Sequence, residues 1–193
     1  MKIAIIDYGA GNVQSVKYAL NRLGYDSFLT DKSELIRSAD KVIFPGVGEA
    51  ASAMNAIREK QLEKVIAELK QPVLGICLGM QLMCNYSEEG DTLGLGIFDL
   101  RVKRFGKGLK VPQIGWNQIE ELRSPLFQGI KEKEYMYLVH SYYVPVNENT
   151  IAKTKYGITY ATAIEKDNFY GVQFHPEKSS KAGEMLLKNF LEL

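Results

Sequence analysis

The sequence predicts an α/β protein with a three-layer open mixed sheet: a mainly parallel core, antiparallel strands added in the C-terminal half, and helices on both faces. Up to about residue 87, short apolar runs alternate with segments whose apolar residues recur at helical spacing, as expected for a covered parallel sheet. Beyond it, β-branched and aromatic runs follow one another with only turn residues between them, which indicates antiparallel pairing. A cysteine flanked by glycines at a strand–helix junction completes the pattern of a nucleophile elbow.

The N-terminal half is expected to alternate strands and helices. The expected strands are residues 2–7, 25–30, 41–44 and 73–76. The expected helices are residues 13–23, 31–39, 50–58 and 61–69, with a further helix from residue 78. A turn is expected at residues 9–12. Because Gln14 stands where Gly-x-Gly-x-x-Gly would need its third glycine, we reject a nucleotide-binding loop there.

The C-terminal half is expected to hold further strands and one last helix, after a polar loop at residues 87–96. The expected strands are residues 97–104, 115–121, 135–144, 151–155, 160–165 and 169–174. The last helix begins at residues 178–180, and its inner face carries Ala182, Met185, Leu186 and Phe190. No repeat, low-complexity stretch or linker divides the chain, so residues 1–193 are expected to form one domain.

Composition excludes several classes of protein. A formal net charge of +1 without any basic run argues against a nucleic-acid partner. We find no signal peptide and no apolar run long enough to span a membrane. Cys77 and Cys84 are expected on one helix about 10 Å apart, too far for a disulfide, and two free thiols fit a reducing cytoplasm. With only His140 and His175, a zinc site is not expected.

Cys77 is the candidate nucleophile. Gly75 and Gly79 flank it, and side chains at these positions would collide where a strand turns directly into a helix. That geometry lifts the sulfur out of the sheet and leaves the amide of Leu78 free to stabilise an oxyanion. The alternative is an ordinary buried cysteine among small residues.

A thiol nucleophile needs a base, and His175 ends the apolar run that begins at residue 169. Glu177 lies two residues on, so in extended geometry it faces the same way and can orient the imidazole. The alternative is a surface turn with an incidental ion pair. His140 lies within an aromatic strand with no acid nearby in sequence, so we interpret it as a hydrogen-bonded wall residue.

The loop at residues 45–48, Pro-Gly-Val-Gly, follows the third strand. Glycines at such a position let a backbone N–H approach a substrate closely. The loop could therefore supply a second oxyanion donor, although an ordinary strand–helix turn has the same appearance.

Together these segments resemble the class I glutamine amidotransferases. The resemblance narrows to members that serve histidine biosynthesis, and it covers the chain from Ile6 to the C-terminus. The segments that carry it are residues 44–48, 75–82, 112–117, 137–142, 171–177 and 187–191. The chain departs from many members in having only a brief segment at residues 90–96.

The resemblance implies roles for individual positions. Cys77 would be the nucleophile, His175 the base and then the acid, and Glu177 the orienting carboxylate. The oxyanion hole would be formed by the amides of Val47 and Leu78, the former turned correctly only when a partner is active. Glutamine would be held by Gly46, Gln81, Glu89, Ser141 and Tyr142, and the partner would meet Asn12, Trp116 and Tyr137.

The implied activity is hydrolysis of L-glutamine to glutamate and ammonia through a cysteinyl thioester, with no metal or organic cofactor. The implied partner is a separate (β/α)8-barrel cyclase subunit in a heterodimer, which would use the ammonia. Three alternatives remain: a glutaminase subunit of another synthase, such as pyridoxal phosphate synthase, a non-catalytic regulatory module that binds a partner, or a stand-alone cysteine hydrolase.

Overall fold

The computed structural model describes residues 1–9 and 12–193. The strands are β1 (Ile3–Ile6), β2 (Ser27–Thr30), β3 (Lys41–Gly46), β4 (Val73–Cys77), β5 (Cys84–Ser87), β6 (Thr92–Leu93), β7 (Phe98–Arg104), β8 (Gln113–Gln118), β9 (Tyr135–His140), β10 (Tyr142–Pro145), β11 (Thr150–Tyr156), β12 (Ile158–Lys166) and β13 (Phe169–Val172). The helices are α1 (Val13–Arg22), α2 (Ser33–Arg37), α3 (Ala50–Glu59), α4 (Glu63–Ala67), α5 (Leu78–Leu82), α6 (Ser180–Glu192) and the short 3-10 helices η1 (Pro125–Phe127) and η2 (Pro176–Lys178).

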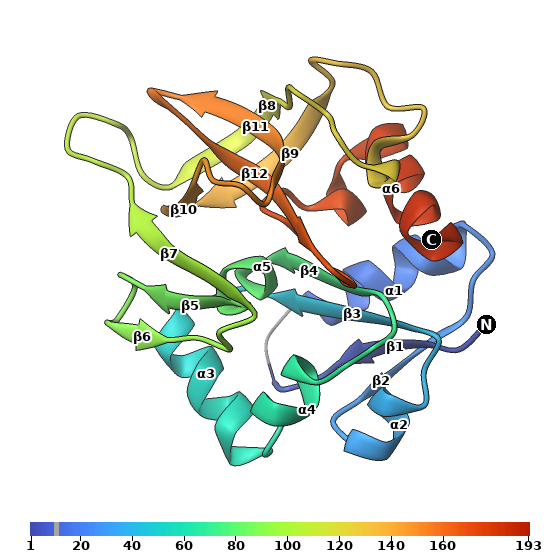
Figure 1. Ribbon diagram of the computed structural model, residues 1–193. Helices are drawn as coiled ribbons and strands as arrows, with labels where there is room; N and C mark the ends of the chain where they lie inside the picture. The colour runs from blue at the N-terminus through green and yellow to red at the C-terminus, as the bar shows by residue number, and fades with distance from the viewer. Residues whose placement is uncertain (10–11) are drawn as a thin grey trace.

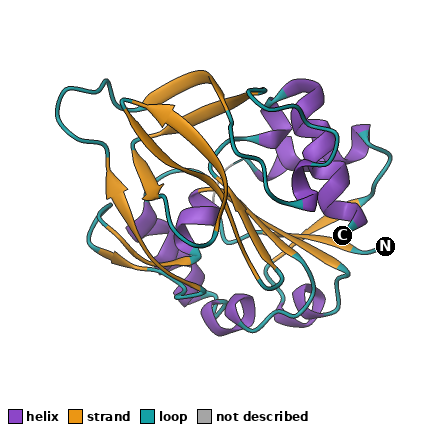
Figure 2. Ribbon diagram, turned by 45° about the horizontal axis from the view of Figure 1, so that its top comes forward, coloured by secondary structure: helices purple, strands orange, loops and turns teal. Residues whose placement is uncertain are grey.

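The main sheet has the strand order β2-β1-β3-β4-β13-β12-β10-β7-β5-β6, with β11 paired to β12 (Figure 1). Strands β2, β1, β3, β4 and β13 pair in parallel. Helices lie on both sides of these central strands (Figure 2). The predicted mainly parallel core is therefore confirmed, and its last strand, β13, leads directly into the His-Pro-Glu segment beside the cysteine strand.

Antiparallel strands extend this core, as predicted. Strand β12 pairs antiparallel with β13, β11 and β10, and β10 pairs antiparallel with β7. Strand β5 is an exception in this half, because it pairs with β7 in parallel. Strands β8 and β9 form a separate antiparallel ribbon in which Trp116 lies opposite Tyr137.

Several expectations from the sequence were wrong in detail. Cys84 does not share a helix with Cys77, because α5 ends at Leu82 and Cys84 begins β5, where it pairs with Phe98. The strand expected at residues 135–144 is interrupted at Ser141, so that β9 joins the ribbon and β10 joins the main sheet.

The polar loop expected at residues 87–96 contains the short strand β6, which pairs with β5. The turn expected at residues 9–12 includes residues 10 and 11, which lie outside the described residues. Within the part of the chain that the structure describes, no helix is long and apolar enough to cross a membrane.

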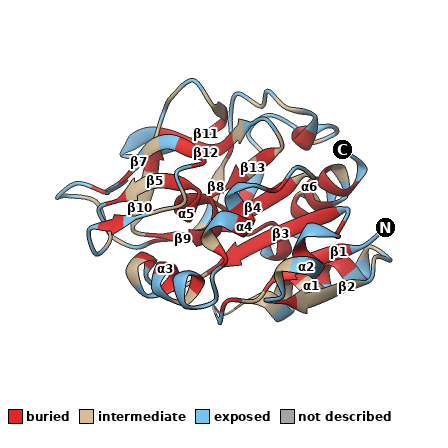
Figure 3. Ribbon diagram, turned by 60° about the horizontal axis from the view of Figure 1, so that its bottom comes forward, coloured by how far each residue is buried: buried red, intermediate tan, exposed pale blue. Residues whose placement is uncertain are grey.

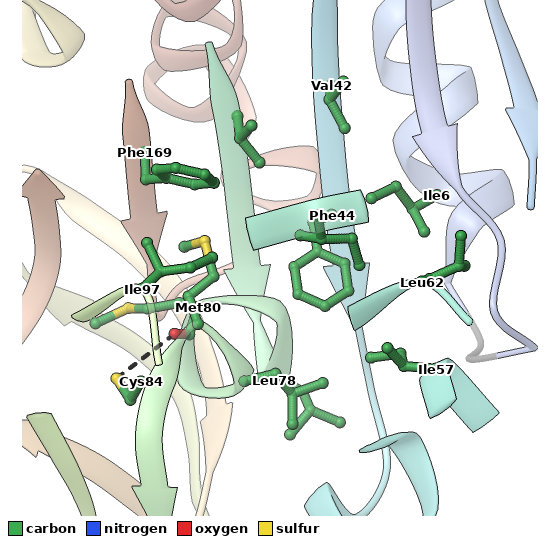
Figure 4. Packing of buried hydrophobic residues seen from close by; sticks show 14 of the residues in the cluster. Ile6, Val42, Phe44, Ile57, Leu62, Leu78, Met80, Cys84, Ile97 and Phe169 are labelled. Carbon is green, nitrogen blue, oxygen red and sulfur yellow. Dashed lines mark hydrogen bonds between the residues drawn. The ribbon is translucent and has the colours of Figure 1, made fainter. Parts of the chain in front are cut away.

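The hydrophobic core has two parts, one on each face of the sheet. Successive side chains of a strand point to opposite faces, and accordingly Ile3 and Ile5 belong to one cluster while Ala4 and Ile6 belong to the other. Figure 3 shows the central strands as the buried part of the molecule, and Figure 4 shows the cluster that contains Ile6 and packs against α3, α4 and α5. Both clusters include residues of β3 and β4, so these two strands, which end at the candidate site, are packed on both faces.

Candidate active site

A strained backbone holds Cys77 at the junction of β4 and α5. Its φ is 53° and its ψ is −110°, a conformation that non-glycine residues rarely adopt. A Cβ on Gly75 would lie 2.9 Å from the amide nitrogen of Met80, and one on Gly79 would lie 1.9 Å from the carbonyl oxygen of Phe44. Both neighbouring glycines are therefore required by close packing of the turn against the strands, as their spacing in the sequence indicates.

His175 is held close to Cys77 by the segment that follows β13. Its backbone N–H donates to the carbonyl of Tyr137 at 2.9 Å, and its own carbonyl accepts from Oγ of Ser179 at 2.7 Å. The side chain is buried, with Nδ1 2.8 Å from Oε1 of Glu177, and it lines the same cavity as Cys77. The structure thus brings the thiol, the imidazole and the carboxylate into one line of contacts.

The charge state of His175 follows from its surroundings. Burial alone would lower the pKa of His175, but hydrogen bonds to Cys77 and Glu177, together with their negative charges, outweigh burial and raise its pKa to about 10. The imidazole therefore keeps its proton at neutral pH for as long as the sulfur beside it is negatively charged. An imidazolium beside a thiolate is the arrangement that a cysteine nucleophile requires.

His140 has the opposite environment. It is buried, Nδ1 lies 2.7 Å from the carbonyl oxygen of Tyr142, and Nε2 lies 3.1 Å from the hydroxyl of Tyr160. Burial lowers the pKa of His140 to about 4, the Tyr142 carbonyl opposes that shift, and the charge of His175 adds to it. His140 is thus a neutral, hydrogen-bonded residue in the wall of the site, which agrees with the interpretation of the sequence.

The two histidines give a direct prediction for pH titration. In an NMR titration of the imidazole carbons, neither histidine should titrate between about pH 5.5 and 8.5, since His140 is already neutral and His175 is still protonated. Glu177→Gln removes a negative charge that raises the pKa of His175 and leaves only a neutral amide oxygen as acceptor at Nδ1, so the midpoint of His175 should move down toward 6.5. A His175 that titrates near 6.5 in the unaltered chain would contradict this description of the site.

A cavity of about 290 Å³ opens beside the cysteine. That volume is near the lower end for small-molecule sites. Nearly all the residues predicted to contact substrate are found there. The lining residues are Val47, Gly48, Cys77, Leu78, Gln81, Glu89, Pro112, Val139, His140, Ser141, Tyr142, His175 and Lys178. Gly46 is not among them, although it pairs with Cys77 across β3 and β4.

Gln173 belongs to the site although the sequence reasoning missed it. Its Nε2 lies 3.7 Å from Sγ of Cys77, and its Oε1 accepts from Nε2 of Gln81 at 2.8 Å. The same nitrogen of Gln81 donates to the carbonyl of Tyr142 at 3.0 Å. The sequence does offer a signal, because Gln173 lies between the apolar residues Val172 and Phe174. A polar side chain buried in such a run needs hydrogen-bond partners.

Glu89 and Lys178 place charges of opposite sign in the cavity wall. Oε2 of Glu89 accepts the backbone N–H of Ala50 at 2.9 Å, and burial raises the pKa of Glu89, partly offset by that hydrogen bond. Lys178, Pro112 and Val139 were not predicted. Among the described residues, no group of three histidine, cysteine or acidic side chains could hold a metal ion.

The three residues predicted to meet a partner do not share one environment. Trp116 is 52% exposed, and its ring contacts that of Tyr137 edge to face at 5.9 Å between centroids on the β8–β9 ribbon. Asn12 is partly buried, and its Nδ2 donates to Oε1 of Glu177. Asn12 therefore contacts the carboxylate of the site, a position that its sequence context does not reveal.

This fold and this site define an amidotransferase of the cysteine-elbow type, and sequence comparison agrees. The chain belongs to the class I glutamine amidotransferase family, whose model matches residues 4–193. It is 57% identical over 196 positions to imidazole glycerol phosphate synthase subunit HisH of Bacteroides fragilis strain YCH46, with 100% of both chains covered. It is 50% identical over 194 positions to the subunit of that name from Haemophilus influenzae strain Rd, covering 100% of this chain and 98% of the other.

Solved structures share the fold at low sequence identity. A structure described as glutamine amidotransferase superposes with a TM-score of 0.77 at 20% identity, covering 98% of this chain and 97% of that one. The structure of PurLQS from Thermotoga maritima gives 0.75 at 14% identity, covering 99% and 97%. These likenesses bear on the fold alone.

Proposed function

We propose that this chain is the glutaminase subunit of an imidazole glycerol phosphate synthase, and that residues 1–193 form its single amidotransferase domain. It hydrolyses glutamine and passes the ammonia to a synthase subunit in histidine biosynthesis. The observation that carries the proposal is identity of 50–57% along the whole chain to subunits of that synthase. The placement of Cys77 and His175 in one cavity, with Glu177 bonded to the imidazole behind it, supports the proposal chemically.

The proposed reaction uses the three residues in sequence. The Cys77 thiolate forms a bond to the side-chain amide carbon of glutamine, and the carbonyl oxygen becomes an oxyanion. Backbone N–H groups of Val47 and Leu78 hold that oxyanion, and a single such donor is worth about 3 kcal/mol. His175 then gives its proton to the amide nitrogen, the carbon–nitrogen bond breaks, and ammonia leaves a cysteinyl thioester.

The second half of the reaction restores the enzyme. His175, now neutral, takes a proton from water, and the hydroxide attacks the thioester carbon. The carbon–sulfur bond breaks, releasing glutamate and the thiolate beside the reprotonated imidazole. Glu177 keeps Nδ1 of His175 engaged at 2.8 Å throughout, so that the other nitrogen faces the sulfur and the substrate. No metal or organic cofactor takes part in these steps.

Glutamine is proposed to bind along the cavity with its side-chain amide at Cys77. Gln81, Ser141 and Tyr142 line the walls, and Gly46, which pairs with Cys77 across β3 and β4, would contact glutamine through its backbone. The carboxylate of Glu89 is suited to the ammonium group of a free amino acid, because it adds a negative charge in a partly enclosed space.

The proposed partner is a (β/α)8-barrel cyclase subunit that forms a heterodimer with this chain in the cytoplasm. Apolar side chains on one face of the β8–β9 ribbon favour such an interface. Ile114, Trp116 and Tyr135 are 64%, 52% and 50% exposed, and exposed aromatic side chains of this kind commonly mark docking surfaces. With Tyr137 beside them, and Asn12 contacting Glu177, the interface would adjoin the site.

Partner dependence is the test of this function. The purified chain alone should hydrolyse glutamine slowly, since the Val47 amide is expected to turn inward only in the complex. Adding the cyclase subunit with imidazole glycerol phosphate should raise kcat by about 100-fold, the size expected for one preorganised oxyanion donor. Glutamate release measured with each subunit separately and together decides the matter. Stimulation by a pyridoxal phosphate synthase partner instead would reassign the pathway.

Trp116→Ala tests the interface within the same assay. The concentration of cyclase needed for half-maximal stimulation should rise about 10-fold or more, as for a buried aromatic anchor. Stability of the isolated chain should fall by only about 1–2 kcal/mol, because the side chain is half exposed and its main loss is the edge-to-face contact with Tyr137. Leu93→Ala, which truncates a 66% exposed residue on β6, is the control and should alter neither quantity. A large fall in the melting temperature of Trp116→Ala would place Trp116 in the core.

A further inference from the structure

Tyr8 is a buried residue that contacts β3, the strand that leads into the loop at residues 45–48. It lies just beyond the end of β1, is 2% exposed, and packs its ring 5.6 Å from that of Phe44. Its hydroxyl donates to the carbonyl oxygen of Pro45 at 3.1 Å. Burial, and secondarily the charge of Cys77, raise the pKa of Tyr8, so the hydroxyl remains a donor at neutral pH.

The sheet explains why Pro45 needs this donor. Strand β1 pairs with β3 only as far as Ile43, whereas β4 pairs with β3 as far as Gly46, beside Cys77 (Figure 1). Strand β3 therefore extends beyond β1 by three residues on the side that faces away from the cysteine.

The direction of the Pro45 carbonyl follows from alternation along β3. The N–H of Lys41 donates toward β1, and that of Val42 donates toward the β4 side. Residues two or four apart in a strand direct their backbone groups to the same side, so Pro45 points the same way as Lys41. Its carbonyl therefore faces the side that β1 no longer covers. Proline has no N–H to satisfy, and the Tyr8 hydroxyl supplies the hydrogen bond that a longer β1 would have made.

The loop that follows lies between two cavities. Val47 and Gly48 line the cavity at Cys77, and they also line a second cavity of about 170 Å³ whose walls include Tyr8 and Ser52. Open space on both sides gives these two residues freedom to reorient. The end of β3 has no such freedom, because a Cβ on Gly46 would already lie 2.5 Å from the Tyr8 hydroxyl.

We propose that Tyr8 is a positioning residue for the oxyanion hole. By holding the Pro45 carbonyl, it fixes the end of β3, so that only the two peptide groups joining residues 46, 47 and 48 can reorient. This inference rests on the proposed glutaminase function, in which Val47 supplies an oxyanion amide. Tyr8 acts through the backbone of β3 and touches neither substrate nor the reacting atoms.

Tyr8→Phe tests the proposal, because it removes the hydroxyl and keeps the ring. In the complex with the cyclase subunit and imidazole glycerol phosphate, kcat should fall about tenfold, the loss of one buried hydrogen bond acting on the transition state. The KM for glutamine should change less than twofold. The pH profile for alkylation of Cys77 by iodoacetamide should be unchanged, because alkylation does not use the oxyanion hole.

Hydrogen exchange of the isolated chain gives a readout that does not depend on activity. In Tyr8→Phe, exchange should quicken in the peptide covering residues 44–49 and remain unaltered in β4 and β13. Tyr156→Phe is the matched control, because it also deletes a hydroxyl that donates to a backbone carbonyl, that of Lys110 at 2.7 Å, away from the cavity. It should change neither kcat nor exchange at residues 44–49.

Several results would overturn the proposal. These are a kcat of Tyr8→Phe within twofold of the unaltered chain, an alkylation profile that shifts in step with kcat, or exchange that quickens equally throughout the sheet. The second would mean that Tyr8 acts on the sulfur, and the third that it only stabilises the fold. If the unaltered complex failed to hydrolyse glutamine, the proposed function would fall, while exchange at residues 44–49 would still decide whether Tyr8 fixes the end of β3.

Discussion

Replacing Cys77 with alanine is expected to abolish glutamine hydrolysis. The substitution removes the only protein atom that forms a bond to substrate carbon in the proposed reaction, and loss of a covalent nucleophile costs on the order of 10⁶-fold in kcat. The fold should survive, because alanine is smaller than cysteine, although the strained φ of 53° is retained. Glutamate release by the complex with the cyclase subunit is the measurement, with trapping of a labelled thioester as a second readout.

Cys84→Ala is the matched control for this experiment. Cys84 is the other free thiol of the chain, and it is fully buried at the start of β5, with Sγ 3.8 Å from the carbonyl oxygen of Met80. Burial raises the pKa of Cys84 to about 12, so it carries no thiolate at neutral pH. Most activity should remain. Hydrolysis that persists in Cys77→Ala, or disappears only in Cys84→Ala, would remove the nucleophile assignment.

The parts of the site that sequence predicts well are those fixed by local geometry. Gly75 and Gly79 identify the elbow because both close contacts involve residues of the turn or the adjoining strand. The contact between His175 and Glu177 is also predicted, although the extended geometry assumed for it is wrong, because Pro176–Lys178 form the 3-10 helix η2 and Glu177 meets the imidazole from that turn. The parallel core is predicted for the same reason, because each strand carries its own apolar pattern.

The parts that sequence does not predict depend on contacts between distant segments. Asn12 and Glu177 are 165 positions apart and meet only because α1 packs beside η2. The break at Ser141 separates two sheets, yet the residues on either side of it are mostly aromatic or aliphatic, and their pattern is that of one continuous strand. The helix expected to contain Cys84 ends early because β5 pairs with β7, and this pairing cannot be read from residues 78–84 alone.

Gly79→Ala should damage both the fold and the activity. An added Cβ would lie 1.9 Å from the carbonyl oxygen of Phe44 and 2.9 Å from its carbonyl carbon. Both are backbone atoms of β3, which lies in the centre of the sheet, so they cannot turn aside as a flexible side chain would. Helix α5 must move instead, at a cost of about 1–3 kcal/mol or more, which for a chain of this size lowers the melting temperature by roughly 3–10 °C.

The same movement would displace the reacting groups, because α5 begins immediately after Cys77. Misplacement by about 1 Å can cost 100-fold in rate, so kcat of the complex should fall far more than the change in stability alone would suggest. Gly106→Ala is the control, since a Cβ there meets nothing within 4 Å, and its stability should change by less than about 0.5 kcal/mol. Calorimetry and glutamate release are the measurements. If they found Gly79→Ala indistinguishable from Gly106→Ala, the turn would have space for a Cβ at Gly79, and crowding would not explain why glycines flank the cysteine.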